Sequence, residues 1–447
     1  MEQLIISVSG LRGIVGSTLT LDVAIRYATA YSALADPGPF VVARDGRASG
    51  IMLAKAIHAA LNASGRDTID AGVAATPTLG VLIREMNAAG GIQISASHNP
   101  PEYNGLKLFS AEGRVIPKGP GQKVRERYDE GATCWVGYAE LGETSVCEDP
   151  HKPHLDAVLA TVDVDRIRAK NFNVLLDSNR ASGSILGRRL LEALGCQITI
   201  LGEEPDGLFE HTAEPTAENL DSVREKIVEA GAGIGFCQDP DADRLAVIDA
   251  SGRYIGEEYT LALCVDHMLR HSQGPIVMNC ASSRMSEDLA DKYGVPLHRA
   301  AVGEANVVDR MLETNALFGG EGNGGPIDPR VGLVRDSFVG MAQILDAMSA
   351  RDMSVADLAD EIPSYSIVKK KVDLDSEKVE AGIDAVVRHF FDATSDRSDG
   401  LRLDWPGRWL LIRASNTEPI VRTIAEAPTE AEAVSLCEQA KKILMSI

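Results

Sequence analysis

The chain has 447 residues, 45% of them hydrophobic and 24% charged, which is the composition of a soluble protein with several cores. At ~150 residues per domain, this length predicts about three domains, or four small ones. The formal net charge of −21 argues against nucleic-acid and anionic-membrane partners, because such surfaces would repel it at long range. A small phosphorylated ligand is still compatible, since a few local arginines can bind one against the overall field.

The seven cysteines are scattered singly and form no CxxC pair. We therefore expect reduced thiols, with neither a disulfide framework nor a zinc site. The start of the chain, MEQLIISVSGLRG, lacks the basic and apolar regions of a signal peptide, and no run approaches ~18 consecutive apolar residues. These features predict a cytoplasmic protein without a transmembrane helix.

Three stretches share one order of elements. Residues 40–72 predict a short β-branched strand, a turn, an Ala-rich helix and a second strand, and residues 173–202 repeat that order. Both stretches contain the tetrapeptide Arg-Ala-Ser-Gly, and residues 275–303 form a weaker third copy. A strand–helix–strand unit of this size is a βαβ crossover, which predicts three related α/β domains with mainly parallel mixed sheets.

The last part of the chain follows a different pattern. It predicts a strand (IVKKKVDL), a helix (SEKVEAGIDAVVRHFF), a hairpin turned at Pro406-Gly407, another strand and a final helix. This order is typical of an α+β domain with an antiparallel sheet. With turn-rich boundaries near 150, 253 and 364, we expect four domains: residues 1–150, 151–253, 254–363 and 364–447.

Ser97 lies in a polar turn after an apolar run. The stretch GIQISASHNPPEYNG passes Ser97, His98 and Asn99 before two prolines stop regular structure. In open α/β sheets, ligands bind at the carboxyl edge of the strands. Because a serine is a weak nucleophile without a base or a metal, two interpretations stay open. The stretch is either a plain polar turn or a turn that presents Ser97.

Three aspartates alternate in the loop QDPDADR. Asp239, Asp241 and Asp243 lie between two apolar segments, IGF and LAVI. In an extended chain, Asp239 and Asp243 would be ~13 Å apart, whereas Mg²⁺ needs its ligands ~2.1 Å away, so a metal site requires the loop to curl. An EF-hand is excluded, because Arg244 stands where that loop needs glycine. A solvated acidic turn is the alternative.

A third loop, FGGEGNGGPIDP, places five glycines around Glu321 and Asn323. Glycine lets the backbone approach a ligand closely, and the two side chains can accept from and donate to sugar hydroxyls. A flexible loop would look similar. No GxxxxGK[ST] sequence occurs, which excludes a P-loop.

A fourth loop, RASNTEPIVR, follows the apolar run WLLI. Its two arginines, Arg413 and Arg422, flank Ser415, Asn416 and Thr417. Arginine forks, hydroxyls and loop amides are the usual means of binding a phosphate dianion.

Together the four loops resemble those of the α-D-phosphohexomutase family, which includes phosphoglucomutase/phosphomannomutase and phosphoglucosamine mutase. SASHNP is similar to the phosphoserine loop of that family, DPDADR to its metal loop and RASNTEP to its terminal phosphate-binding loop. GGEGNGG stands where the family has its sugar-binding GExSGH, with Asn323 in place of Ser and Gly325 in place of His.

The resemblance implies four domains around a central cleft and a reversible 1-phosphate to 6-phosphate interconversion of a hexose through a hexose 1,6-bisphosphate. It implies Mg²⁺ as the cofactor and a monomer or homodimer as the assembly. The residues that it implies are Ser97 as phosphoryl carrier; Asp239, Asp241, Asp243 and a phosphate oxygen on Ser97 as metal ligands; Arg12, His98, Lys107 and Arg244 around the transferring phosphate; Glu321 and Asn323 at the sugar; and Arg413, Ser415, Asn416, Thr417 and Arg422 at the other phosphate.

Two other classes of protein could share some of these residues. A magnesium-dependent sugar-phosphate phosphatase could use the same serine and aspartates, but it would not need a second phosphate loop. A non-catalytic sugar-phosphate binding protein would not need an aspartate triad beside a nucleophile. Nothing in the loops is placed to read carbon 2, so we expect activity on more than one of glucosamine, mannose and glucose phosphates, with glucosamine favoured.

Overall fold

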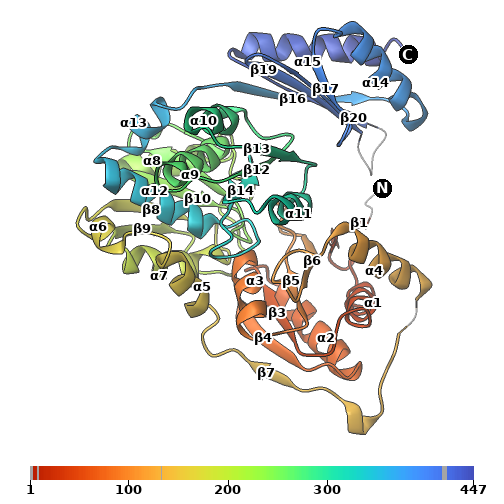
Figure 1. Ribbon diagram of the computed structural model, residues 1–447. Helices are drawn as coiled ribbons and strands as arrows, with labels where there is room; N and C mark the ends of the chain where they lie inside the picture. Colours follow the sequence, from red (N-terminus) through yellow and green to blue (C-terminus); the bar gives the residue numbers. More distant parts are fainter. Residues whose placement is uncertain (1–3, 8–9, 132, 415–419) are drawn as a thin grey trace. The chain divides into compact units, whose positions relative to one another are not determined.

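The computed structural model describes residues 4–7, 10–131, 133–414 and 420–447. It divides into two compact units, whose helices and strands are labelled in Figure 1. The first unit is Met1–His267 with Asn323–Ala359, and the second is Met268–Gly322 with Asp360–Ile447. Among the described residues, no helix combines the length and the apolar character that crossing a membrane would need.

The first predicted βαβ crossover is present. Strand β3 (Phe40–Arg44) is followed by helix α2 (Ser49–Ala63) and by β4 (Thr68–Val73), which pairs with β3 in parallel. The sheet is mixed, because β6 runs antiparallel between β2 and β5. Its order is β1-β2-β6-β5-β3-β4-β7, and the remaining strands are β1 (Ile5–Ser7), β2 (Gly10–Ile14), β5 (Gly90–Ile94), β6 (Tyr103–Ser110) and β7 (Thr144–Val146).

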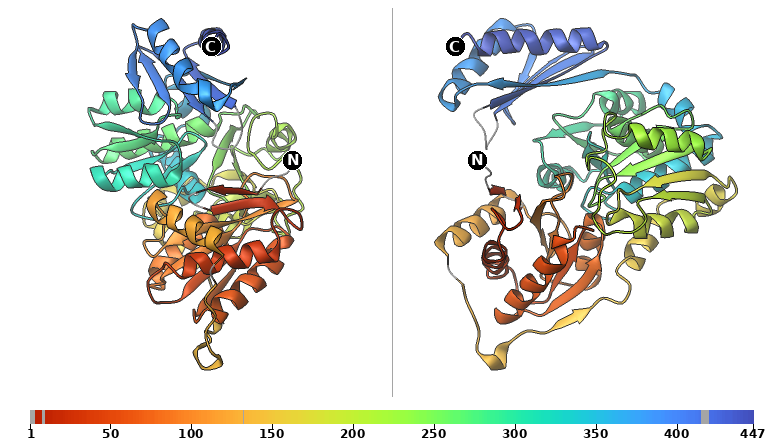
Figure 2. Two further views of the ribbon diagram at one scale, coloured as in Figure 1. Left: turned by 90° about the vertical axis from the view of Figure 1, so that its right-hand side faces the viewer. Right: turned by 180° about the vertical axis from the view of Figure 1, so that it is seen from behind.

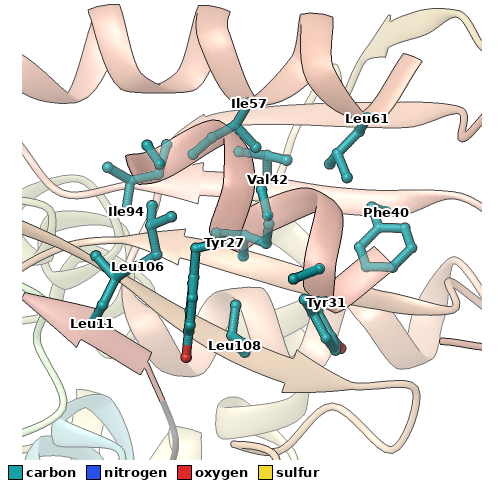
Figure 3. Close-up of a cluster of buried hydrophobic side chains, with 14 of the residues drawn as sticks. Leu11, Tyr27, Tyr31, Phe40, Val42, Ile57, Leu61, Ile94, Leu106 and Leu108 are labelled. Carbon is teal, nitrogen blue, oxygen red and sulfur yellow. The ribbon is translucent and has the colours of Figure 1, made fainter. Parts of the chain in front are cut away.

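The main core of this sheet lies beneath two helices. In Figure 3, Tyr27 and Tyr31 of α1 and Ile57 and Leu61 of α2 point toward side chains of the strands. Ile57 is completely buried, and burying such a side chain stabilises the fold by about 1.5–3 kcal/mol. The helices of this part are α1 (Leu21–Ser32), α2, α3 (Thr76–Glu85), α4 (Lys118–Glu130) and the 3₁₀ turn Tyr138–Glu140.

The second crossover is also confirmed. Strand β8 (Asn173–Asp177) pairs in parallel with β9 (Gln197–Leu201) and with β10 (Ile234–Gln238). Strand β11 (Leu245–Asp249) returns antiparallel to β10, so the loop between them opens at the carboxyl end of β10. The sheet order is β11-β10-β8-β9, and the helices are α5 (Lys152–Leu159), α6 (Val164–Arg168), α7 (Gly183–Ala193) and α8 (Asp221–Glu229).

A buried histidine explains why a late segment of the chain belongs to the first unit. His154 of α5 is fully buried, with Nδ1 2.9 Å from Thr78 Oγ1 and Nε2 2.7 Å from Asp336 Oδ2. Asp336 also caps the N-terminus of α12, so three distant segments meet at one ring. The elements at this end are α9 (Glu257–His271), β15 (Gly325–Ile327), α12 (Ser337–Arg351) and α13 (Val355–Asp360).

The second unit begins with the third predicted copy. Strands β12 (Ile276–Asn279) and β13 (Leu297–Ala300) pair in parallel, with α10 (Met285–Tyr293) between them in sequence. Strand β14 (Phe318–Glu321) pairs with β12 in parallel after α11 (Glu304–Thr314). The carboxyl ends of β12 and β14 therefore lie at the same edge of the sheet.

The C-terminal part of this unit is the predicted α+β domain. Its antiparallel sheet has the order β16-β20-β19-β18-β17, and both helices cover one face of that sheet (Figures 1 and 2). The hairpin turns at Pro406-Gly407, where Gly407 has a φ of +77°. The elements are β16 (Ser366–Asp373), the 3₁₀ turn Ser376–Lys378, α14 (Val379–His389), β17 (Thr394–Asp396), β18 (Leu401–Trp405), β19 (Arg408–Ala414), β20 (Ile420–Ala427) and α15 (Glu430–Leu444).

Trp409 joins the two halves of the second unit. Its side chain is fully buried, packs with Cys280 and Leu411, and donates from Nε1 to Glu426 Oε1 at 2.7 Å. The guanidinium of Arg402 lies 4.3 Å from the centre of the tryptophan ring and donates to the carbonyl of Cys280. Buried contacts of this kind hold the two sheets of the unit together.

Candidate active site

Ser97 sits in a tight turn just beyond the carboxyl end of β5, as predicted. It is 1% exposed, and its φ of +49° is in the left-handed region that few non-glycine residues adopt. Its backbone N–H donates to Ser95 Oγ at 2.9 Å, and Ser95 Oγ donates to Asp45 Oδ2 at 2.7 Å. The turn is therefore held by side chains rather than by a strand ladder.

The hydroxyl of Ser97 points into the aspartate loop. Ser97 Oγ donates to Asp239 Oδ2 at 2.9 Å and lies 3.3 Å from His98 Nδ1. These contacts join the β5–β6 loop to the β10–β11 loop, which is 142 residues further along the chain. The first two loops identified in the sequence thus meet at one place in the first unit.

The aspartate loop curls as a metal site would require. Asp239, Asp241 and Asp243 are completely buried, and one oxygen from each lies within 4.8 Å of the others. Ala242 takes a φ of +54°, and Asp239 Oδ1 accepts from the backbone N–H groups of Asp243 and Arg244 at 3.1 Å each. The interpretation as a solvated acidic turn is wrong, because these carboxylates are buried.

Positive groups surround the three carboxylates. Lys107 Nζ, on β6, donates to Asp241 Oδ2 at 2.8 Å and to Asp243 Oδ2 at 3.0 Å. Arg335 Nη2 donates to Asp243 Oδ2 at 2.6 Å, and Thr76 Oγ1 donates to Asp241 Oδ2. Burying charge in a protein is costly unless it is paired in this way.

The pKa values of the carboxylates diverge. Burial by itself raises the pKa of Asp241, but the Lys107 ammonium and the hydrogen bonds from Lys107 and Thr76 outweigh it and hold that pKa below its usual range. Burial raises the pKa of Asp239 well above its usual range, and the charges of Asp243 and Asp241 add to the rise. Crowded carboxylates of this kind favour a bound cation.

The predicted basic residues frame the same site. Arg12 Nη1 donates to Asn99 Oδ1 at 3.1 Å, and Arg244 Nη1 donates to Glu214 Oε1 at 3.4 Å. Burial lowers the pKa of His98 to about 3, and the charges of Arg244 and Arg12 contribute. The imidazole of His98 is therefore neutral at neutral pH.

The donor set fits a hard divalent cation. Asp241 Oδ1 and Asp243 Oδ1 are buried and accept no hydrogen bond from the residues that the structure describes. Mg²⁺ binds through carboxylate oxygens and keeps open positions for phosphate or water. Such a cation would satisfy the two buried oxygens.

Glu321 lies in the second unit at the end of β14. It is 3% exposed, and its Oε1 accepts from Asn279 Nδ2 at 2.7 Å and from the Gly303 N–H at 2.9 Å. Asn323 belongs to the first unit, where its buried Oδ1 accepts no hydrogen bond from the described residues. The carboxylate of Glu321 is thus rigidly oriented at the carboxyl edge of a parallel sheet.

Arg413 and Arg422 face each other across β19 and β20. Arg413 Nε lies 2.9 Å from Asp399 Oδ2, and Asp399 Oδ2 also accepts from the Val302 N–H at 2.8 Å. Arg422 is exposed. The other predicted phosphate-binding residues, Ser415, Asn416 and Thr417, lie outside the described residues.

Comparison with known proteins decides the family. The chain matches "Phosphoglucomutase/phosphomannomutase, alpha/beta/alpha domain I" over residues 3–133, domain II over 152–252, domain III over 257–365 and the C-terminal domain over 370–443. It is 35% identical over 445 residues to the "Phosphoglucomutase/phosphomannomutase" of Thermococcus kodakarensis, covering 97% of each chain. The chain belongs to the phosphoglucomutase/phosphomannomutase family.

Further relatives agree with this assignment. The "Probable phosphoglucosamine mutase" of Pyrococcus horikoshii is 32% identical, with 98% of this chain and 97% of the relative covered. A crystal structure of a "Phosphoglucomutase/phosphomannomutase family protein" from Burkholderia thailandensis is 26% identical, covers 99% of this chain and 98% of its own, and has a TM-score of 0.85. The expected fold class and the expected enzyme class, a phosphohexomutase, are confirmed.

Sequence reasoning missed several residues that this phosphohexomutase brings to the site. Thr76 and Arg335 contact the aspartates from segments that carry no recognisable motif. Arg47 begins the first Arg-Ala-Ser-Gly sequence, and Asp45 lies two residues before it. The repeated tetrapeptide is the feature of the sequence that could have pointed to Arg47, because it marks a loop at the carboxyl end of a strand.

Proposed function

We propose that this protein interconverts the 1-phosphate and the 6-phosphate of a hexose through phosphoserine at position 97 and a hexose 1,6-bisphosphate. The observation that carries the proposal is the 2.9 Å contact between Ser97 Oγ and Asp239 in the buried aspartate cluster. A nucleophile beside paired carboxylates and basic groups is the arrangement that phosphoryl transfer needs, because catalysis depends on in-line placement and on neutralised charge.

Asp239, Asp241 and Asp243, with a phosphate oxygen on Ser97, would hold Mg²⁺. When bound, the ion would supply positive charge at the transferring phosphoryl group. Arg12 and Arg244 would orient the equatorial oxygens of that group. The proposal is supported by the burial of all three carboxylates and by the two oxygens that accept no hydrogen bond among the described residues.

The proton steps fall to His98 and Lys107. As the sugar hydroxyl attacks phospho-Ser97, a new P–O bond forms and the bond to Ser97 Oγ breaks. The sugar hydroxyl must lose one proton, and Ser97 Oγ must gain one. With Ser97 unphosphorylated, burial and the charges of Arg244 and Arg12 lower the pKa of His98 and keep its ring neutral. Its Nδ1 lies 3.3 Å from Ser97 Oγ, within reach of a hydrogen bond. We assign the acid–base role to Lys107, with His98 as the neutral partner that aligns Ser97 Oγ.

Three further residues that the family resemblance implies would hold the rest of the substrate. Glu321 would accept from sugar hydroxyls, since Asn279 and Gly303 fix its orientation. Arg413 and Arg422, with the loop between them, would bind the phosphate that is not reacting. A bisphosphate that must turn end for end needs one reacting site and one separate phosphate site, and a phosphatase needs only the first.

The test combines mass spectrometry with ³¹P NMR. Protein treated with glucose 1,6-bisphosphate and Mg²⁺ should gain ~80 Da, the mass of one phosphoryl group, at Ser97. At least two of the 6-phosphates of glucosamine, mannose and glucose should be converted to the 1-phosphate, and the corresponding 1-phosphates should be converted back. Release of inorganic phosphate as the main product would indicate the phosphatase instead, and an unmodified, inactive protein would refute the mutase mechanism.

A further inference from the structure

Arg47 is a buried cation that the mechanism above does not use. It lies between β3 and α2, in the first Arg-Ala-Ser-Gly sequence, and is 1% exposed. A fully buried arginine is rare unless it is paired or satisfies several acceptors. The groups that accept hydrogen bonds from Arg47 therefore indicate its role.

The guanidinium of Arg47 binds the carbonyl groups of the loop that contains Ser97. Nη2 donates to the carbonyls of Ser97 at 2.8 Å and Asn99 at 2.5 Å. Nη1 donates to the carbonyls of Pro100 at 2.5 Å and Tyr103 at 2.9 Å. One planar group thus holds four carbonyls, three from the loop and one from Tyr103, the first residue of β6.

The other side of Arg47 is fixed as well. Its Nε donates to Asp45 Oδ2 at 3.1 Å and its backbone N–H donates to Asp45 Oδ1 at 3.0 Å. Asp45 also accepts from Ser95, which holds the backbone N–H of Ser97. The ring of Phe209 covers the guanidinium at 4.9 Å. These contacts orient the guanidinium of Arg47 independently of its bonds to the loop.

This loop needs such support because it has little of its own. Ser97 has a φ of +49°, and Pro100 and Pro101 have no backbone N–H to donate. The backbone bonds of the loop are turn bonds, such as those from the Asn99 N–H to the Ala96 carbonyl at 3.1 Å and from the Tyr103 N–H to the Pro100 carbonyl at 3.0 Å. Arginine presents five donors in a fixed plane, whereas lysine presents three from one atom. Lysine at this position could not reach the same four carbonyls at once.

The second Arg-Ala-Ser-Gly sequence provides a comparison within the chain. Arg180 has the same place in its repeat, but its guanidinium binds Asp206 and lies 3.8 Å from Glu210, and its side chain is 27% exposed. It contacts no residue of the Ser97 loop in these interactions. The two arginines share a sequence context and differ in what they hold.

We propose that Arg47 is a positioning residue for phosphoryl transfer. By fixing the carbonyls on both sides of His98, it sets where Ser97 Oγ lies relative to Asp239. The inference rests on the proposed function, since it concerns how that function's nucleophile is aligned.

The test compares Arg47→Lys with Arg180→Lys in the Mg²⁺-loaded full-length protein. A displacement of about 1 Å at the reacting atom costs on the order of 10²-fold in rate. We expect kcat for glucose 1-phosphate to fall ~100-fold in Arg47→Lys, with KM within ~3-fold, because Glu321 and Arg413 are intact. The rate at which glucose 1,6-bisphosphate phosphorylates Ser97, measured by intact-mass spectrometry, should fall to a similar extent in Arg47→Lys. Arg180→Lys should behave as wild type in both assays.

Several outcomes separate this inference from the proposed function. If the wild type is active but Arg47→Lys keeps the kcat of Arg180→Lys, or loses only thermal stability, Arg47 is structural and the inference is overturned. If the wild type gains no phosphoryl group, the proposed function itself fails. If Arg47→Lys does not fold, Asp45→Asn is the second variant, because it keeps Arg47 but weakens the ion pair that orients it. A ~10-fold fall in kcat with KM unchanged supports the inference, and an unchanged kcat overturns it.

Discussion

The backbone of Ser97 allows its chemical role to be separated from its structural role. Ser97→Ala and Ser97→Gly both remove the hydroxyl, and with it a hydrogen bond to Asp239 worth about 1 kcal/mol. Alanine keeps a side chain at a φ of +49°, which costs roughly 1–2 kcal/mol, while glycine relieves that cost. Glycine also raises the conformational entropy of the unfolded chain, which lowers the free energy of unfolding by about 0.4–1 kcal/mol relative to alanine. The relief of backbone strain is larger than this loss, so Ser97→Gly should be more stable than Ser97→Ala by about 0.8 kcal/mol.

Thermal unfolding measured by circular dichroism in EDTA reports this difference, which should be about 1 °C in Tm for a chain of 447 residues. Ser64 offers a matched control, because its φ is −92° and the order there should reverse, with Ser64→Ala more stable than Ser64→Gly. Both Ser97 variants should lose more than about 10³-fold in kcat, since the nucleophile is gone. Activity above ~1% of wild type in either variant, or a Ser97→Gly that is less stable than Ser97→Ala, would refute the reasoning.

Three further predictions concern the metal, the second phosphate and the sugar. Asp241→Asn should weaken Mg²⁺ binding and reduce the rise in Tm that Mg²⁺ gives, and excess EDTA should inactivate the parent protein reversibly; full activity in EDTA contradicts the metal assignment. Arg413→Ala should raise KM and release more hexose 1,6-bisphosphate, while Arg408→Ala, on the same strand, should do neither; equal bisphosphate release would place the phosphate site elsewhere. More than one hexose phosphate should be turned over, and a preference above ~10⁴ in kcat/KM for one sugar would mean that another residue of the protein contacts carbon 2.

The sequence by itself determined the helices, strands and turns whose formation depends on residues close together in the chain. The three βαβ crossovers and the C-terminal antiparallel sheet follow from apolar periodicity and from turns at glycine and proline, and both signals are local. The four loops could be found for the same reason, since each follows a buried strand. The short strands β7 and β17 were missed because three exposed residues carry no period.

Only the tertiary structure decided which loops meet and what holds them. Arg47 and Arg180 occupy the same tetrapeptide, yet Arg47 supports a loop 50 residues away and Arg180 pairs with Asp206. Arg335 reaches Asp243 across 92 residues, and no pattern around it predicts that contact. Periodicity reports which face of an element is buried, but it does not report which distant group lies opposite. That depends on how the sheets pack, and packing is set by many weak contacts that no single motif encodes.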